Sequence, residues 1–344
     1  MLNTGKIKCI NKIRRSLTII IPIDKPIVLL QMEALLRRIR EFHPKRSIII
    51  EDLAKRTAGH KGEVSLNFHL SGLDQKQFRI LHNVRLKVNE FIFQIDFMLV
   101  STNFILILEV KNIAGTIHFE SNFDQFIRTI NGKEEGFYNP LVQVRRQENL
   151  LNQWLKVNKF PSIPIESFIV FTNPQTIIKA DNRFRDSKKI IHSYYLATKI
   201  DLLEKIHRHQ SLTEKDLAKL TRLIKKKNEP EEVDILARYG IKKEEILKGI
   251  HCPNCSYLPL KRKGKWICEK CRCFFQDAHL IALHDYLLLL QPTISYQQFK
   301  DFLQIESRSV ASKLLSSLGL SYTGSTKNRV YYLSKDSIFD TSSS

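Results

Sequence analysis

Charged side chains lie at the ends of two strongly apolar segments. Asp96 belongs to Phe91–Val100, and Glu109 and Lys111 close the next segment, Phe104–Lys111. Glu109 and Lys111 are two residues apart, so their side chains share one face of a strand. A hard divalent cation held by two carboxylates, with a lysine nearby to stabilise transition-state charge, would offset the cost of burying these acids. The structural alternative is a salt bridge between Asp96 and Lys111.

Five of the six cysteines lie between residues 252 and 273. Cys252 and Cys255 form one Cys-x₂-Cys pair, and Cys268 and Cys271 form a second pair after twelve intervening residues. Two such pairs are typical of a zinc ribbon, in which four thiolates bind a structural Zn²⁺ tetrahedrally. Cys273 is an alternative to Cys271. Clustered rather than dispersed cysteines favour metal binding in a reducing cytoplasm over a disulfide framework.

The composition indicates a folded, basic protein. The chain has 344 residues, 55 Lys+Arg against 35 Asp+Glu and a net charge of +20, with 43% hydrophobic residues, 12 Gly and 11 Pro. These values exclude collagen-like and low-complexity classes and favour a polyanionic partner, either nucleic acid or an anionic membrane surface. The most apolar stretch, Ser16–Gln31, is interrupted by Pro22, Asp24, Lys25 and Pro26, so no membrane span is expected.

The elements that position the acids follow from hydrophobic periodicity and capping signals. Strands are expected at Phe78–Leu86, Phe91–Val100 and Phe104–Lys111, followed by a helix from Pro140 to Val157 with Asn139 as its cap, and by a strand at Ser167–Thr172. This order indicates an α/β unit with a crossover helix. A hairpin is expected around Asn131-Gly132 in the segment Glu120–Gly136.

Three helices are expected before these strands. One is a basic amphipathic helix at Leu29–Phe42, the second includes Glu51–Arg56, and the third runs from Lys61 to Leu70 after the break signals Gly59 and Gly62. Glu63 would then lie at the start of a helix, where the helix dipole favours a negative charge.

The combined pattern resembles the nuclease-related domain (NERD) family, a branch of the restriction-endonuclease-like superfamily with an Asp…(Asp/Glu)-x-Lys signature. The matching elements are Ala58–Glu63, Ile95-Asp96, Glu109-Val110-Lys111-Asn112 followed by Gly115, and Asn139-Pro140 with Gln143 and Gln147. The likeness covers roughly residues 30–175. It implies a restriction-endonuclease-like mixed sheet flanked by helices and metal-dependent cleavage of DNA.

The resemblance also implies roles for individual residues. Asp96 and Glu109 would bind Mg²⁺ or Mn²⁺, with the carbonyl of Val110 as a candidate third ligand. Lys111 would orient the attacking water or neutralise charge that develops on the phosphate. Glu63 would supply the additional acid of the first core helix. The glutamines Gln143 and Gln147 would either line the same pocket or cross the seam between helix and sheet.

The region after residue 250 offers candidate nucleic-acid contacts. The ribbon, with short strands expected at Tyr257–Leu260 and Lys265–Ile267, carries basic and aromatic side chains suited to phosphates and bases. Three helices and a hairpin, at Leu280–Leu290, Ser295–Leu303, Ser307–Leu318 and residues 320–333, resemble a winged helix, which binds either DNA or protein. The candidate contact residues are Lys261, Arg262, Lys263, Lys265, Trp266, Arg308, Lys313, Lys327 and Arg329.

These patterns predict the following division of the chain. Residues 1–29 form a basic and apolar extension, 30–225 the nuclease-like domain, 226–250 a helical linker, 251–276 the zinc ribbon, 277–336 the winged-helix-like domain and 337–344 a disordered tail. The favoured function is a cytoplasmic, Mg²⁺-dependent nuclease acting on DNA. The alternatives are a DNA-binding accessory protein that does not cut, and a basic protein that binds membranes through Ser16–Gln31.

Overall fold

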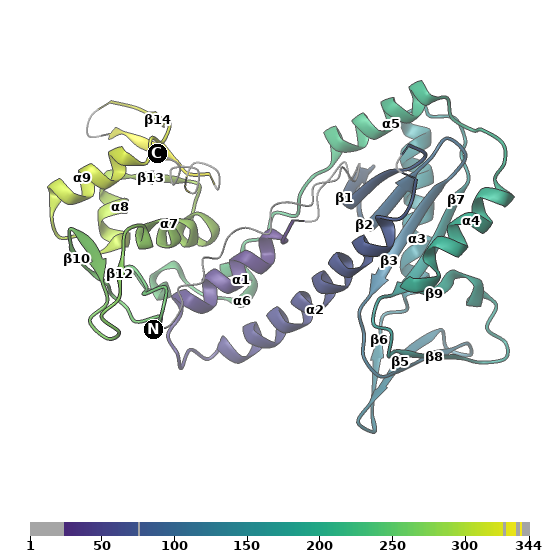
Figure 1. Ribbon diagram of the computed structural model, residues 1–344, viewed down its shortest axis with the longest axis horizontal. Helices are drawn as coiled ribbons and strands as arrows, with labels where there is room; N and C mark the ends of the chain where they lie inside the picture. Colours follow the sequence, from purple (N-terminus) through teal and green to yellow (C-terminus); the bar gives the residue numbers. More distant parts are fainter. Residues whose placement is uncertain (1–23, 75, 326–327, 335–337, 339–344) are drawn as a thin grey trace, which may run out of the picture. The chain divides into compact units, whose positions relative to one another are not determined.

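The computed structural model describes residues 24–74, 76–325, 328–334 and 338 (Figure 1). The described chain forms two compact units, one of Ala58–Glu231 and the other of Lys25–Thr57 together with the residues from Glu232 onward. Most of the extension predicted at 1–29 and of the tail predicted at 337–344 lies outside the described residues. Across the described chain, no helix is both long enough and apolar enough to cross a membrane.

The first unit is built on a mixed five-stranded sheet with the order β1-β2-β3-β7-β9. β1 (Arg79–Val88), β2 (Phe91–Val100) and β3 (Ile105–Lys111) are antiparallel neighbours. β7 (Ile165–Phe171) and β9 (Ile190–His192) run parallel to β3. The predicted mixed α/β fold is therefore confirmed.

Helices cover both faces of this sheet (Figure 1). α3 (Pro140–Val157) and α5 (Glu214–Lys227) bury apolar side chains against one face. α2 (Arg46–Leu70) and α4 (Leu196–Ile206) do so against the other. α3 begins where predicted, because Asn139 accepts a hydrogen bond from the N–H of Leu141 at 3.0 Å and Pro140 needs no donor at this position.

A second sheet of the first unit has the order β6-β5-β4-β8. Its strands are β4 (Thr116–Glu120), β5 (Gln125–Ile130), β6 (Lys133–Phe137) and β8 (Ile177–Ala180). The predicted hairpin is confirmed: β5 and β6 pair across Asn131 and Gly132, which both have positive φ. Such a two-residue turn matches the right-handed twist of the flanking strands.

The break expected at Gly59 and Gly62 is wrong, because α2 is continuous through both glycines. Gly62 allows close packing and does not end the helix. A Cβ atom at this position would lie 2.7 Å from Cβ of Asn112 and 2.9 Å from Oγ1 of Thr172. The end of β3 therefore approaches the α2 backbone closely, and the side-chain amide of Asn112 donates to the carbonyl of Ala58 at 2.8 Å.

The second unit has one hydrophobic core to which distant segments of the chain contribute. Its helices are α1 (Ile27–Arg38), α6 (Ile235–Tyr239), α7 (Ala278–Leu289), α8 (Tyr296–Leu303) and α9 (Arg308–Ser317), with a 3₁₀ turn, η3, at Lys243–Glu245. β13 (Thr293–Ser295), β14 (Tyr322–Thr323) and β15 (Val330–Tyr332) form a small sheet in the order β13-β15-β14. The order of these elements is compatible with the winged-helix-like segment.

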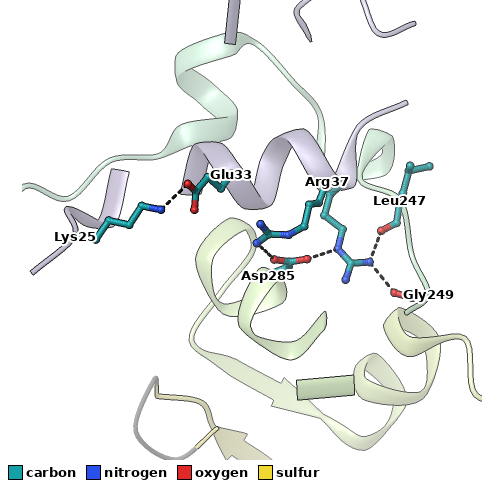
Figure 2. Close-up of polar contacts among 7 residues, drawn as sticks. Lys25, Glu33, Arg37, Leu247, Gly249 and Asp285 are labelled. Carbon is teal, nitrogen blue, oxygen red and sulfur yellow. Dashed lines mark hydrogen bonds and ion pairs between the residues drawn. The ribbon is translucent and has the colours of Figure 1, made fainter. Parts of the chain in front are cut away.

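A buried ion pair ties α1 to α7 (Figure 2). Nε of Arg38 lies 2.8 Å from Oδ2 of Asp285, and both side chains are almost fully buried. The same guanidinium donates to the carbonyls of Leu247 and Gly249, at 3.1 and 2.7 Å, and Arg37 binds the other oxygen of Asp285 at 2.6 Å. Such full pairing is what a charge buried in a core requires.

The position of α1 differs from the predicted domain division. Residues 30–57, expected to belong to the nuclease-like domain, pack with the C-terminal unit, because α1 buries Val28, Met32 and Leu35 in its core. Residues of the predicted linker, among them Ile235 and Leu236 of α6, are buried in the same core.

The close approach at Gly62 can be tested by a pair of substitutions in α2. Gly62→Ala is expected to lower the free energy of unfolding by about 1–3 kcal/mol, because the added methyl group overpacks the contact with Asn112 and Thr172. Gly59→Ala is the matched control: nothing lies within 4 Å of its added Cβ, so it should raise stability by about 0.5–1 kcal/mol. Urea denaturation of both variants measures the difference, and equal effects would contradict the packing role of Gly62.

Candidate active site and cysteine cluster

The acids Asp96 and Glu109 come from neighbouring antiparallel strands. Phe97 of β2 and Leu108 of β3 are the last paired residues at this end of the two strands, and Asp96 and Glu109 are their immediate neighbours in the chain. The carboxylate of Asp96 also accepts a hydrogen bond from the N–H of Val110, at 2.9 Å. The strand pairing therefore holds the two acids at the same end of the sheet.

Asp96 lies where β2 reverses the faces to which its side chains point. Ile95 and Phe97 are two residues apart, yet Ile95 packs against the core on the α3 side and Phe97 against the core on the α2 side. Asn83, opposite Asp96 on β1, has a φ of 52° and accepts a hydrogen bond from the side chain of Gln94 at 2.7 Å. Both strands are thus irregular at the level of Asp96.

Glu109 is 2% exposed and is held by two neighbouring side chains. Nζ of Lys111 lies 2.6 Å from its Oε1, and Nε2 of Gln147 donates to its Oε2 at 2.9 Å. Nζ of Lys111 also reaches Oε1 of Gln143 at 3.3 Å. Oε1 of Gln147 is buried and has no hydrogen-bond partner among the described residues. The structure therefore brings Lys111 and both glutamines of α3 to Glu109, and Lys111 pairs with Glu109 rather than with Asp96.

The electrostatics of Asp96 show that the site lacks positive charge. Burial is the main cause that raises the pKa of this carboxyl well above its ordinary value, and the negative charges of Glu109 and Glu63 raise it further. Lys111 and the N–H of Val110 act in the opposite direction but do not outweigh these effects. Asp96 thus favours the protonated form until another positive charge reaches the site.

Glu63 reaches the site from the middle of α2. The prediction that it lies at a helix start is wrong, because α2 begins at Arg46. Its Oε2 lies 2.8 Å from Nε2 of the buried His82 and 3.9 Å from Nδ1 of His60. Neither histidine was identified from the sequence. The available signals were a polar residue inside an apolar strand for His82 and the three-residue spacing from Glu63 for His60.

The chemistry of the donor set fits a hard divalent cation. Asp96 and Glu109 offer carboxylate oxygens, and Mg²⁺ is commonly bound by one or two carboxylates together with phosphates of the substrate. Among the described residues, three or more metal-binding side chains (His, Cys, Asp or Glu) come close enough to share one ion at the four cysteines, and not at Asp96 and Glu109. Asp96 and Glu109 would therefore supply only part of the coordination shell of such a cation.

The cysteines Cys252, Cys255, Cys268 and Cys271 converge, with all four Sγ atoms within 4.8 Å of one another. Sulfur atoms about 2.3 Å from a common tetrahedral Zn²⁺ would lie at such separations. The two pairs have the same backbone turn: the N–H of Ser256 donates to the carbonyl of Cys252, and that of Arg272 to Cys268, both at 2.9 Å. The cluster can hold a metal ion.

Cys273 lies beside this cluster, and its Sγ is directed to the carbonyl of Cys271 at 3.6 Å. The ribbon strands are β10 (Lys261–Lys263), β11 (Lys265–Ile267) and β12 (Phe274–Phe275). The strand expected at Tyr257–Leu260 is wrong, because the chain becomes extended and paired only from Lys261.

The predicted nucleic-acid contacts of the second unit are mostly accessible. Those that are exposed are Lys261, Lys263, Lys265, Arg308 and Lys313. Arg262 is half-buried, and the guanidinium of Arg329 stacks on the ring of Tyr322 at 4.0 Å. Lys327 lies outside the described residues.

The expectation that Trp266 contacts bases is contradicted by its burial. Its side chain is 2% exposed and belongs to the core of the second unit. Its indole N–H donates to Nδ1 of His279 at 3.2 Å.

Comparisons with known proteins agree with the geometry of the first unit. The family model described as a nuclease-related domain matches residues 58–172. An uncharacterized protein of Bacillus anthracis is 26% identical over 151 residues, which are 43% of this chain and 68% of that protein. No solved structure matches the chain. Residues 58–172 of this chain thus match the nuclease-related domain, and the matched range contains Glu63, Asp96, Glu109, Lys111 and both glutamines of α3.

Proposed function

We propose that the first unit is a metal-dependent nuclease that hydrolyses phosphodiester bonds in DNA. The observation that carries the proposal is the placement of Asp96 and the buried Glu109 on neighbouring strands beside Lys111, since adjacent acids in a protein interior are stabilised by a cation. Asp96 and Glu109 would hold Mg²⁺ or Mn²⁺, with the carbonyl of Val110 as a further ligand. The cation would supply positive charge that polarises the phosphate and favours ionisation of water.

The neighbouring side chains have complementary roles in this proposal. Nζ of Lys111 is held by Glu109 and Gln143 and would donate to the phosphate oxygen on which negative charge develops. Gln147 keeps the carboxylate of Glu109 oriented through its hydrogen bond, and its unpartnered Oε1 could accept from the attacking water. Glu63 would be the additional acid that draws a proton or a second cation toward Asp96.

The second unit would hold the nucleic acid. The exposed basic side chains of the ribbon and of α9 fit contacts with phosphates, and the net charge of +20 favours association with a polyanion. The four cysteines would bind a structural Zn²⁺, which contributes to the folding of the ribbon. Unoxidised thiolates of this kind fit a reducing, cytoplasmic location.

Catalysis is tested by removing the charge of each acid without changing its shape. Asp96→Asn and Glu109→Gln are expected to lower the rate of Mg²⁺-dependent DNA cleavage by about 10³-fold or more, and Lys111→Met by a comparable factor. Digestion of plasmid and single-stranded DNA under single-turnover conditions measures these rates. Glu90→Gln is the matched control, because its side chain is 92% exposed.

Wild-type cleavage rates in all three variants would exclude these residues from the mechanism. DNA binding that persists in EDTA, without cleavage under any divalent cation, would instead support the accessory DNA-binding protein.

The raised pKa of Asp96 predicts how the cation changes stability with pH. Without divalent cations, the folded protein retains a proton on Asp96 that the unfolded chain releases, so this residue lowers the free energy of unfolding as pH rises above about 4. Added Mg²⁺ should counter this loss, and its stabilising effect should grow with pH because it competes with the proton. Thermal unfolding of wild type and Asp96→Asn at pH 5–8, with and without Mg²⁺, tests this. A pH-independent Mg²⁺ effect that survives in Asp96→Asn would contradict it.

The cysteine cluster predicts which thiol is needed for metal. Cys268→Ser is expected to abolish stoichiometric zinc in the purified protein and to lower the melting temperature of the second unit, because one of four ligands is lost. Cys273→Ser should retain about one zinc per chain. Elemental analysis after dialysis measures both. Retention of zinc by Cys268→Ser, or its loss from Cys273→Ser alone, would contradict the assigned ligand set.

A further inference from the structure

A pocket of about 480 Å³ lies in the first unit beside the edge strand β9. It is formed by β8, β9, the start of α4 and two 3₁₀ turns, η1 (Asp186–Lys189) and η2 (Ser193–Tyr195). The side chains that matter below are Lys179, Phe184, His192, Tyr195 and Lys199. The candidate active site uses none of them.

The strand register relates this pocket to Lys111. Lys111 of β3 pairs with Phe171 of β7, and Phe171 pairs with His192 of β9. These three strands are parallel, so their carboxyl ends lie on the same side of the sheet. The backbones of Lys111 and His192 are two strand spacings of about 4.8 Å apart, which is about 10 Å. In open α/β sheets, ligands commonly bind at the carboxyl ends of the strands.

Rings of Phe184, His192 and Tyr195 line the pocket, and Tyr194 lies against two of them without lining it. The rings of His192 and Tyr194 are stacked, with an interplanar angle of 8° and centroids 5.1 Å apart. Tyr195 packs against Tyr194 at 4.8 Å, and the two tyrosines are 54% and 55% exposed. Nδ1 of His192 is buried and has no hydrogen-bond partner among the described residues. The site therefore offers exposed ring faces and one unsatisfied polar atom.

The charge of the pocket is positive. Lys179 and Lys199 line it, no acidic side chain does, and neither lysine forms an ion pair with the described acids. Asp181, two residues after Lys179, accepts a hydrogen bond from His118, and Asp186 pairs with Arg145. Asp201, two residues after Lys199, does not line the pocket. Two lysines without carboxylate partners beside aromatic faces are the combination that binds unpaired nucleotides.

We propose that this pocket binds an unpaired nucleotide of a single-stranded nucleic acid, its base stacked on Tyr195 and its phosphate between Lys179 and Lys199. A base within a duplex cannot occupy it, because both of its faces are covered by neighbouring base pairs. This inference rests on the proposed nuclease function. If the first unit cleaves nucleic acid, its substrate would be single-stranded, or a duplex with separated strands, beside the phosphate that is cleaved.

Binding is measured apart from cleavage. The full-length protein in EDTA is titrated against a fluorescein-labelled single-stranded oligonucleotide and against its duplex, with fluorescence anisotropy as the readout. Tyr195→Leu is expected to weaken single-strand binding by about 5- to 150-fold, the effect of losing one stacked base, and to change duplex binding by less than about twofold. Lys179→Gln combined with Lys199→Gln should weaken single-strand binding and lower its salt dependence.

Phe91→Ala is the matched control, because Phe91 is an aromatic residue with a similar exposed fraction, 54%, on β2, three strands from β9 in the sheet order. This variant should leave both affinities unchanged. Unchanged melting temperatures show that the variants are folded, and the lysine variants remain informative if Tyr195→Leu is not. As a second readout, a 5-bromouracil oligonucleotide should crosslink to Tyr195.

The outcomes separate this inference from the proposed nuclease. Wild-type single-strand affinity in the lysine double variant, or crosslinks that map only outside residues 179–199, would overturn the pocket even if Asp96→Asn abolishes cleavage. Conversely, selective loss of single-strand binding supports the pocket even if no divalent cation promotes cleavage, in which case the proposed nuclease alone fails.

Discussion

The first unit is organised around the cost of gathering carboxylates where water has little access. Three acids contribute, Asp96 from β2, Glu109 from β3 and Glu63 from α2. Asp96 accepts a hydrogen bond from the N–H of Val110, Glu109 contacts Lys111 and Gln147, and Glu63 contacts His82. Only one of these neighbours, Lys111, is a permanent cation. The negative charges of the three acids are therefore not balanced by their neighbours, which is one reason why the pKa of Asp96 is raised. A scaffold that tolerates such a deficit is suited to recruiting a cation together with a phosphate.

The rest of the unit explains how this arrangement is held. The close contact at Gly62 brings α2 near the end of β3, and the cap at Asn139 fixes where α3 starts and hence where Gln143 and Gln147 point. The reversal of faces at Asp96 lets a single strand pack against cores on both sides of the sheet, while the carboxyl of Asp96 is subject to the negative charges of both Glu63 and Glu109. Packing and electrostatics thus act on the same few residues.

Much of this could be predicted from the sequence, but not all of it. Strong local signals gave α3, β2 and the cysteine cluster, because the Asn-Pro cap, the apolar runs and the Cys-x₂-Cys spacing act over short distances. The continuity of α2 could not be predicted, since a glycine that breaks a helix and one that packs against Asn112 look alike in sequence. Likewise, the burial of Trp266 and the association of α1 with α7 depend on contacts between residues far apart in the chain.

The ion pair of Arg38 with Asp285 joins residues separated by 247 positions, and residues 58–231 of the first unit are encoded between them. At a synthesis rate of about 5–20 residues per second, Asp285 is added more than about ten seconds after Arg38. Residues 58–231, which contain both sheets of the first unit, are synthesised during that interval. The ion pair cannot form until Asp285 has been synthesised, so a chain interrupted before this residue leaves the buried guanidinium of Arg38 without its carboxylate.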